Sequence, residues 1–145
     1  MINNLAEYFD PMQKYYLDKV SYNRFENNIH DENNSVEYLL NCADDLMVDL
    51  LNDGVRVTIT RHISFEPKDV YELTVSFGAL LRFNSEKTMD WTQVNLKEEF
   101  RNNGVFVTAN LIHHISLLIA EITSSYGQMP LILAPDFIDR NNEQR

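Results

Sequence analysis

The sequence is poor in cysteine, glycine and proline. Its 145 residues include one cysteine, four glycines and four prolines. Because Cys42 is alone, the chain can form neither an internal disulfide nor a multi-cysteine zinc cluster, which fits a reducing cytoplasm. The glycines are scattered, so they do not build a phosphate-binding loop. Disulfide-stabilised scaffolds and glycine-rich nucleotide sites are thereby excluded.

The sequence also lacks long apolar runs and an excess of positive charge. No stretch approaches the roughly 18 consecutive apolar residues of a membrane helix, and the start has no leader pattern. There are 12 Lys+Arg against 22 Asp+Glu, a formal charge of -10, which repels nucleic acid and anionic lipid. We expect one cytoplasmic domain over residues 1–145, with no nucleic-acid partner and no membrane insertion.

The clearest positive signal is a pair of alternating strands in the middle of the chain. Residues 55–65 carry apolar side chains at alternate positions, with Arg61 as the one break in the apolar row. Residues 71–83 repeat the alternation after a turn, which predicts an antiparallel hairpin with one apolar face. Residues 12–22 and the shorter stretch 89–96 predict two further strands.

The region between the first strand and the hairpin is harder to assign. Residues 27–34 have the composition of a solvated loop, and residues 35–51 have apolar positions at helical spacing. We therefore interpret residues 23–54 as a variable loop followed by an inserted amphipathic helix, with an additional strand at 35–51 as the alternative. The helix would place Asp44, Asp45 and Asp49 on its solvated side.

A second, longer helix is predicted from Ala109 to Tyr126, with Thr108 as its N-cap. It is apolar on more than one side, so we expect the sheet to cover one side and another subunit to cover the other. An apolar, proline-bounded segment, 129–137, and a short tail, 138–145, follow it. Candidate residues for the oligomer interface are Leu111, Ile115, Leu117, Leu118 and Ile122.

Three local motifs, taken in order, carry a family resemblance. They are the first strand Tyr16 to Tyr22, the strand opening Asp69-Val70-Tyr71-Glu72, and the stretch Tyr126-Gly127-Gln128-Met129-Pro130-Leu131-Ile132-Leu133-Ala134-Pro135-Asp136-Phe137. In this order they resemble the SecB family of export chaperones, over most of the chain outside 27–54. The resemblance implies an α+β fold, a four-stranded antiparallel sheet with a long helix on one face. It also implies a homotetramer that holds unfolded polypeptides in apolar grooves without ATP or another cofactor.

A binder of unfolded chains needs aromatic and aliphatic surface rather than a few fixed ligands. The large apolar residues of the predicted strands and of the closing segment could supply that surface. For each of them, burial in the subunit's own core is the alternative. The candidate peptide-binding residues are Tyr71, Phe77, Phe83, Trp91, Phe106 and Phe137.

The sequence departs from the family in two places. Members that deliver cargo to the SecA motor present acidic side chains on the solvent face of the sheet, where Lys19, Asn23 and Gln93 stand here. This departure argues against SecA docking, unless a one-residue shift in register lets Asp18 and Glu26 substitute. The tail is also too short for the family's final helix. A dedicated single-client adaptor, of the toxin–antitoxin or phage type, is therefore as consistent with the sequence as a general export chaperone.

No residue pattern predicts an enzyme. His113 and His114 are adjacent, so on a helix they point about 100° apart and do not share one metal ion. Ser124 and Ser125 lack the glycines of a nucleophile elbow. We expect no catalysis, no metal site and no cofactor. The alternatives from other classes are a hotdog-like small-molecule enzyme or carrier, which needs a larger sheet around its helix, and a purely structural or regulatory oligomer.

Overall fold

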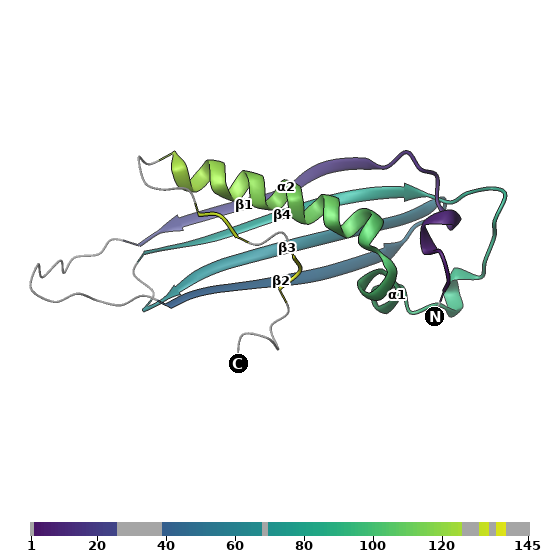
Figure 1. Cartoon of the computed structure of the whole chain (residues 1–145), viewed down its shortest axis with the longest axis horizontal. Coiled ribbons are helices and arrows are strands. Elements are labelled where there is room, and N and C mark those ends of the chain that lie inside the picture. Colours follow the sequence, from purple (N-terminus) through teal and green to yellow (C-terminus); the bar gives the residue numbers. More distant parts are fainter. Residues whose placement is uncertain (1, 26–38, 68–69, 126–130, 134–135, 139–145) are drawn as a thin grey trace, which may run out of the picture.

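A four-stranded antiparallel sheet forms one layer of the structure, and a long helix lies lengthwise across one of its faces (Figure 1). The computed structural model describes residues 2–25, 39–67, 70–125, 131–133 and 136–138. The elements in chain order are η1 (Leu5–Tyr8), β1 (Lys14–Arg24), β2 (Leu39–Leu50), β3 (Gly54–Glu66), β4 (Tyr71–Arg82), η2 (Trp91–Gln93), α1 (Leu96–Asn103) and α2 (Val105–Ser124).

The strands lie in the order β1-β4-β3-β2, and every neighbouring pair is antiparallel. The predicted hairpin is confirmed as β3 and β4, and the predicted first strand as β1. β1 is an edge strand, and a bulge between Leu17 and Lys19 interrupts its pairing with β4. β2 is the other edge strand and pairs with β3 along its whole length, with Asp44 opposite Arg61.

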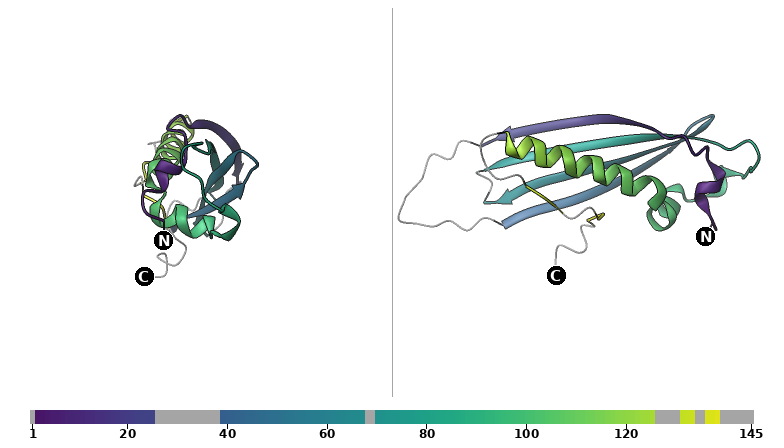
Figure 2. Two further views of the ribbon diagram at one scale, coloured as in Figure 1. Left: turned by 90° about the vertical axis from the view of Figure 1, so that its right-hand side faces the viewer. Right: turned by 45° about the horizontal axis from the view of Figure 1, so that its top comes forward.

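Helix and sheet form two layers, and both views of Figure 2 keep α2 on the same side of the sheet. We call the side that carries α2 the helix face and the opposite side the outer face. On the helix face most of the alternating residues of the hairpin are fully buried, as the binary pattern predicts. These buried strand residues are Val55, Val57, Ile59, Ile63, Leu73, Val75, Ala79 and Leu81.

The predicted helix at 35–51 is wrong, because the described part of this region, from Leu39 to Leu50, is strand β2. Its apolar residues alternate with a period of two once they are paired with β3: Cys42 and Leu46 are buried on the helix face, whereas Met47 is exposed. The acid between those two buried residues, Asp44, hid this alternation in the sequence. Asp44 does not lie on a solvated helix side but is buried. Tertiary pairing has overridden local propensity here.

The predicted strand at 89–96 is also wrong. Asp90 accepts a hydrogen bond from the backbone N–H of Thr92 and begins the short η2 helix. Asn95 accepts one from the N–H of Glu98, at 3.2 Å, and caps α1. Two side chains that favour helix N-caps lie only five residues apart, and this local capping outweighs the irregular alternation. The charge-rich residues 97–101 form the body of α1.

The long helix begins earlier than predicted, at Val105 instead of Ala109, and Gly104 stands at its N-cap in place of Thr108. Gly104 joins α1 directly to α2: a Cβ there would come within 2.2 Å of the Phe100 carbonyl oxygen. The helix ends at Ser124, and its Leu111 and Ile115 are fully buried against the sheet.

By length and composition alone, α2 could cross a membrane, as the core helices of many globular proteins could. It has one strongly buried side, formed by Val107, Leu111, Ile112, Ile115 and Ile119. This side packs on β3 and β4 and makes α2 the second layer of the core.

A buried ion pair replaces an apolar contact in the centre of the sheet. Arg61 Nε donates to Asp44 Oδ1 at 2.7 Å, and Arg61 Nη2 donates to Asp44 Oδ2 at 2.8 Å. Both side chains are 0% exposed. Burial by itself lowers the pKa of Arg61, but the hydrogen bonds and charge of Asp44 more than offset it, so that the pKa lies above its ordinary value. Arg61 is therefore a cation at every working pH.

We expect Arg61→Met to lower the free energy of unfolding by about 3–5 kcal/mol, because it leaves the Asp44 carboxylate buried without its cation. The double variant Asp44→Leu with Arg61→Met should recover most of that loss, since an apolar pair needs no charge compensation. Urea unfolding followed by circular dichroism measures both. A loss of under about 1 kcal/mol for the single variant would contradict this account.

Candidate functional site

Three of the predicted peptide-binding residues, Phe83, Trp91 and Phe106, lie in one aromatic cluster at the end of the sheet near α1. The Phe83 and Trp91 rings are stacked with centroids 5.3 Å apart, and Phe106 stacks on Phe9 at 6.3 Å. Trp91 and Phe9 are buried, and the cluster surrounds the fully buried Phe100. These contacts close the core at this end. Phe83, Trp91 and Phe106 thus contribute mainly to packing within the subunit.

Tyr71 lies at the opposite end of the sheet, in a different environment. Its ring lies 4.9 Å from Phe65 and 5.5 Å from Tyr22, and all three side chains are only partly buried. Leu40 pairs with Phe65 on the neighbouring strand and is also partly buried. We call Tyr22, Leu40, Phe65 and Tyr71 the strand-end surface. It joins one residue from each of the four strands on the helix face.

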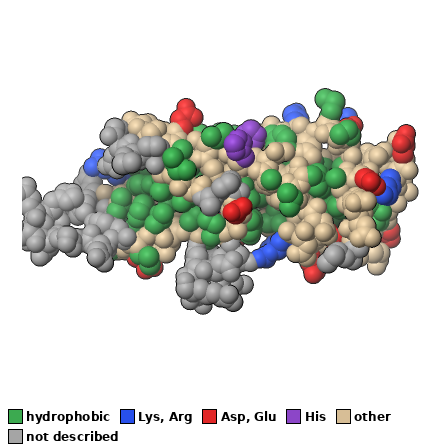
Figure 3. Space-filling view, in the orientation of Figure 1, with side chains coloured by type: hydrophobic (Ala, Val, Ile, Leu, Met, Phe, Trp, Pro, Cys, Tyr) green, Lys and Arg blue, Asp and Glu red, His purple; other side chains and the backbone are tan. Residues whose placement is uncertain are grey.

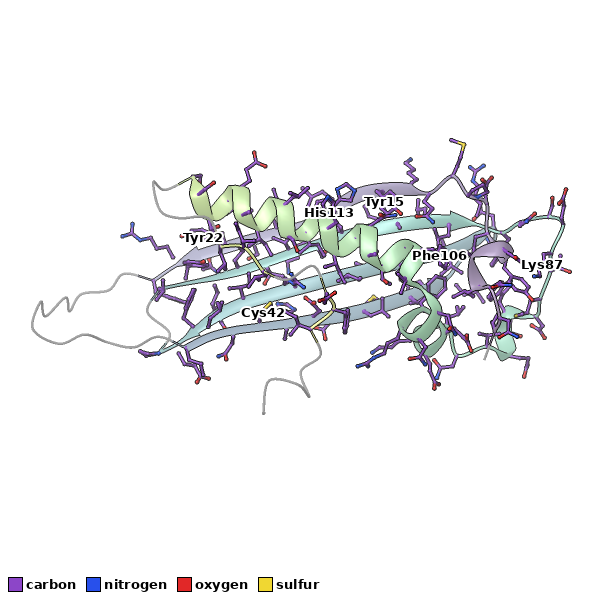
Figure 4. The ribbon with its side chains drawn as sticks, viewed as in Figure 1. Tyr15, Tyr22, Cys42, Lys87, Phe106 and His113 are labelled. Atoms are coloured by element: carbon purple, nitrogen blue, oxygen red, sulfur yellow. The ribbon has the colours of Figure 1, made fainter. Side chains whose placement is uncertain are left out.

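The strand-end surface forms part of a broad apolar area. Figure 3 shows hydrophobic side chains gathered over the strand ends beside the C-terminal half of α2. Figure 4 places Tyr22 at this end and Phe106 at the other, on opposite halves of the molecule. The predicted aromatic residues therefore do not form one continuous lining. Half-buried aromatic rings are concentrated at the strand-end surface, which α2 does not seal.

Phe77 lies midway along β4, where its ring stacks on His114 of α2 with centroids 5.7 Å apart. Its neighbour on the edge strand, Leu17, is 52% exposed. Val20 on β1 and Leu117 on α2 are 44% and 56% exposed. We call Leu17, Val20 and Leu117 the β1–α2 surface. It is the apolar area on the other flank of α2.

The predicted oligomer residues separate into two groups. Leu111 and Ile115 are fully buried inside the subunit and have no surface to offer a partner. Leu117 is exposed, and Leu118 and Ile122 are partly buried. Among the predicted residues, Leu117 therefore lies on the side of α2 that leaves the sheet, whereas Leu118 and Ile122 pack against the core.

The sixth candidate, Phe137, belongs to a segment that lies beside α2 on the helix face (Figure 1). We call residues 131–133 and 136–138 the C-terminal strap. The backbone N–H of Leu131 donates to Thr123 Oγ1 at 2.7 Å, which anchors the start of the strap to the end of α2. Phe137 is partly buried and has the Arg101 guanidinium 5.8 Å from its ring centroid. The strap's Leu131, Leu133 and Ile138 also pack on the core.

The buried ion pair holds the other end of the strap. Arg61 Nη2 donates to the backbone carbonyl of Asp136 at 2.9 Å, and Asp44 Oδ2 accepts the backbone N–H of Ile138 at 2.8 Å. The backbone N–H of Asp44 donates to the carbonyl of Ile138 at 2.9 Å. Arg61 Nη1 also reaches Ser116 Oγ on α2, at 3.2 Å. We call Asp44 and Arg61 the clamp.

The outer face is hollowed and carries polar and apolar side chains. A depression of about 530 Å³ is lined by side chains of the sheet and by Lys97. Arg56 pairs with Asp49 at 3.2 Å and His62 with Asp45 at 3.5 Å, so the lining carries charges of both signs. His62 thus pairs across to β2. The remaining lining residues are Tyr16, Asp18, Leu46, Met47, Thr58 and Thr60.

The residues compared with the family's SecA-docking acids are not all in one place. Lys19 and Asn23 lie on β1, opposite Ser76 and Glu72, but Gln93 belongs to η2 and is outside the sheet. Asp18, at the β1 bulge, accepts a hydrogen bond from Ser76 Oγ at 2.7 Å. Glu26 lies outside the described residues.

The paired histidines do not form a site with other ligands. His113 and His114 are both exposed, with ring centroids 6.1 Å apart. Within the described ranges, no group of three or more His, Cys, Asp or Glu side chains is placed to hold a metal ion.

Sequence reasoning missed several residues that the structure brings together. Tyr22, Leu40 and Phe65 were predicted as strand or helix positions but not as candidate binding residues. Asp44 and Arg61 were not linked, although Arg61 was the one polar residue in an apolar row. A polar residue that is buried in an apolar row, such as Arg61, needs a polar partner from another strand. This requirement could have pointed to Asp44.

No protein-family model and no curated protein sequence matches the chain. Solved structures do match it. One is the SecB-like chaperone Rv1957 of Mycobacterium tuberculosis, in complex with a ChAD peptide from the Rv1956 HigA1 antitoxin. It has a TM-score of 0.67 and 17% identity, covering 91% of this chain and 90% of that chain. A protein of unknown function from Streptococcus agalactiae is less similar, with a TM-score of 0.45 and 10% identity, over 85% and 95% of the two chains. The predicted SecB-like α+β fold is confirmed.

The two aromatic groups should differ in their effect on stability. Phe100→Ala in the closed cluster should lower the free energy of unfolding by about 3–5 kcal/mol, since it leaves a cavity. Phe65→Ala at the strand-end surface should cost less than about 2 kcal/mol, because its ring is already partly solvated. Denaturant unfolding of both variants tests this difference. Equal losses would show that the strand-end surface is ordinary core.

Proposed function

We propose that the protein is an ATP-independent chaperone that binds non-native polypeptides on its helix face, over the strand-end surface. The observation that carries the proposal is the partly buried row of Tyr22, Leu40, Phe65 and Tyr71, which α2 does not cover completely. The similarity in fold to a SecB-like chaperone solved with an antitoxin peptide supports this role.

The chemistry of the strand-end surface suits an unfolded client. Extended chains offer apolar side chains at alternate positions, and large rigid rings contact many such side chains at little cost in rotamer entropy. Two tyrosines in the row add hydroxyl groups that can bond to client backbone. Recognition of this kind is tolerant of sequence and needs neither a nucleotide nor a metal ion.

A dedicated single-client adaptor is the second candidate. The SecB-like neighbour is bound to a peptide from an antitoxin, so the fold accommodates one defined partner. Lys19 and Asn23 on the outer face also depart from the acidic pattern expected for delivery to SecA. Export and a SecA partner remain the alternative role.

We also propose that the protein acts as a homo-oligomer, up to a tetramer, assembled through the β1–α2 surface. Leu17, Val20 and Leu117 expose apolar area on one flank of α2. Exposed apolar side chains of this kind are typical of subunit contacts. The acidic net charge of -10 keeps such a surface soluble before assembly.

Capture of a reduced, carboxymethylated client that stays unfolded tests the chaperone proposal. We expect a stoichiometric complex without ATP, seen by light scattering, and about tenfold weaker binding after Phe65→Ser with Tyr71→Ser. Met47→Ser is the matched control, since Met47 is exposed on the outer face. The absence of any complex at micromolar concentrations would reject a general chaperone and favour the single-client adaptor.

The oligomer proposal has its own test. Leu117→Lys should shift the protein to a smaller species, because it places an unpaired charge in an apolar contact. Met12→Lys is the control, as Met12 is 84% exposed and precedes β1. Light scattering after size-exclusion chromatography gives the mass of each. A wild-type protein that is monomeric at micromolar concentrations would overturn this part of the proposal.

A further inference from the structure

All three hydrogen bonds between the clamp and residues 136–138 end on backbone atoms of the strap. The carbonyl of Asp136, the N–H of Ile138 and the carbonyl of Ile138 are the groups bound. The clamp therefore recognises main-chain groups, one carbonyl and the N–H two residues later, and not a particular side chain. Any other segment with the same backbone spacing could make these bonds.

The clamp is held ready independently of the strap. Arg61 Nε and Nη2 both bond to the Asp44 carboxylate, and Arg61 Nη1 bonds to Ser116 on α2. Each charge thus keeps partners when the strap leaves. Asp44 Oδ2 can then accept a further hydrogen bond, and Arg61 Nη2 can donate one. Charge-assisted hydrogen bonds to such groups are stronger than those between neutral groups. A vacant clamp would favour rapid rebinding of a peptide backbone.

The position of the clamp connects it to the apolar surface. Asp44 and Arg61 occupy the same face of β2 and β3 as Leu40 and Phe65 of the strand-end surface. Along each strand, three residues separate the clamp residue from the residue of that surface. An extended polypeptide lying along this face could reach both.

We propose that the clamp is a binding site for the backbone of an extended polypeptide, filled by the C-terminal strap in the free protein and taken over by a client segment. The inference rests on the proposed chaperone function. In the absence of client, the strap satisfies the clamp and covers part of the helix face. Because the strap is in the same chain, its effective concentration is high, and a client must bind the strand-end surface as well to displace it.

Hydrogen exchange of the full chain, with and without the carboxymethylated client, tests whether a client segment replaces the strap at the clamp. In the complex, the Ile138 amide should lose protection, because its bond to Asp44 Oδ2 is broken. The Asp44 amide should stay protected, because a client carbonyl replaces that of Ile138. A complex in which the Ile138 amide keeps its protection overturns the clamp proposal alone. If no complex forms, the chaperone function fails and the clamp proposal with it.

A pair of variants separates the role of the strap's N–H from that of its side chain. Ile138→Pro removes the N–H that Asp44 accepts, whereas Ile138→Ala keeps it, and both remove the isoleucine side chain. The strap of the proline variant competes more weakly for the clamp. This variant should therefore bind the client about tenfold more tightly than the alanine variant. Equal client affinities of the two variants, measured by fluorescence anisotropy, would overturn the proposal. Neither substitution alters Asp44 or Arg61.

Discussion

The ion pair between Asp44 and Arg61 is the interaction on which the rest of the structure depends. It places a cation and an anion in the buried layer between sheet and helix, where an unpaired charge would be strongly destabilising. Asp44 and Arg61 face each other in one register of β2 against β3. The pair therefore specifies the alignment of β2, an edge strand with a weak sequence signal. The remaining hydrogen-bonding groups of the pair reach Ser116 on α2 and the backbone of the strap. One polar contact thus links four separate parts of the chain.

The two faces of the sheet offer different chemistry. The outer face has a hollow lined by threonines, by charges of both signs and by some apolar side chains, whereas the helix face carries half-buried aromatic and aliphatic side chains on the flanks of α2. A helix covers a narrower band than a four-stranded sheet presents, so apolar strand residues toward the edges and ends remain partly uncovered. The strap fills part of this area on the side of β2. The strand-end surface and the β1–α2 surface are what is left, and they support the proposed roles in client binding and assembly.

Much of the fold could be predicted from the sequence, because β3, β4 and α2 carry strong periodic patterns with buried faces. β2 could not, since Asp44 interrupts its apolar row and only the distant Arg61 makes that position acceptable. The 89–96 segment was misassigned because the caps Asp90 and Asn95 act locally against a loose alternation. The site was harder to predict. Only the tertiary structure shows that Tyr71 is partly buried whereas Trp91 is enclosed by neighbouring rings.

The bulge in β1 has a consequence for how copies of this chain can associate. It divides the free edge of the sheet into a run before Leu17 and a run after Lys19 that are out of step with each other. An incoming strand can therefore continue the ladder over one short run but not over the whole edge. On the opposite edge, the N–H of Asp44 already bonds to Ile138. In the proposed chaperone role the protein would meet aggregation-prone chains, and edges of this kind favour small closed assemblies over open-ended fibres.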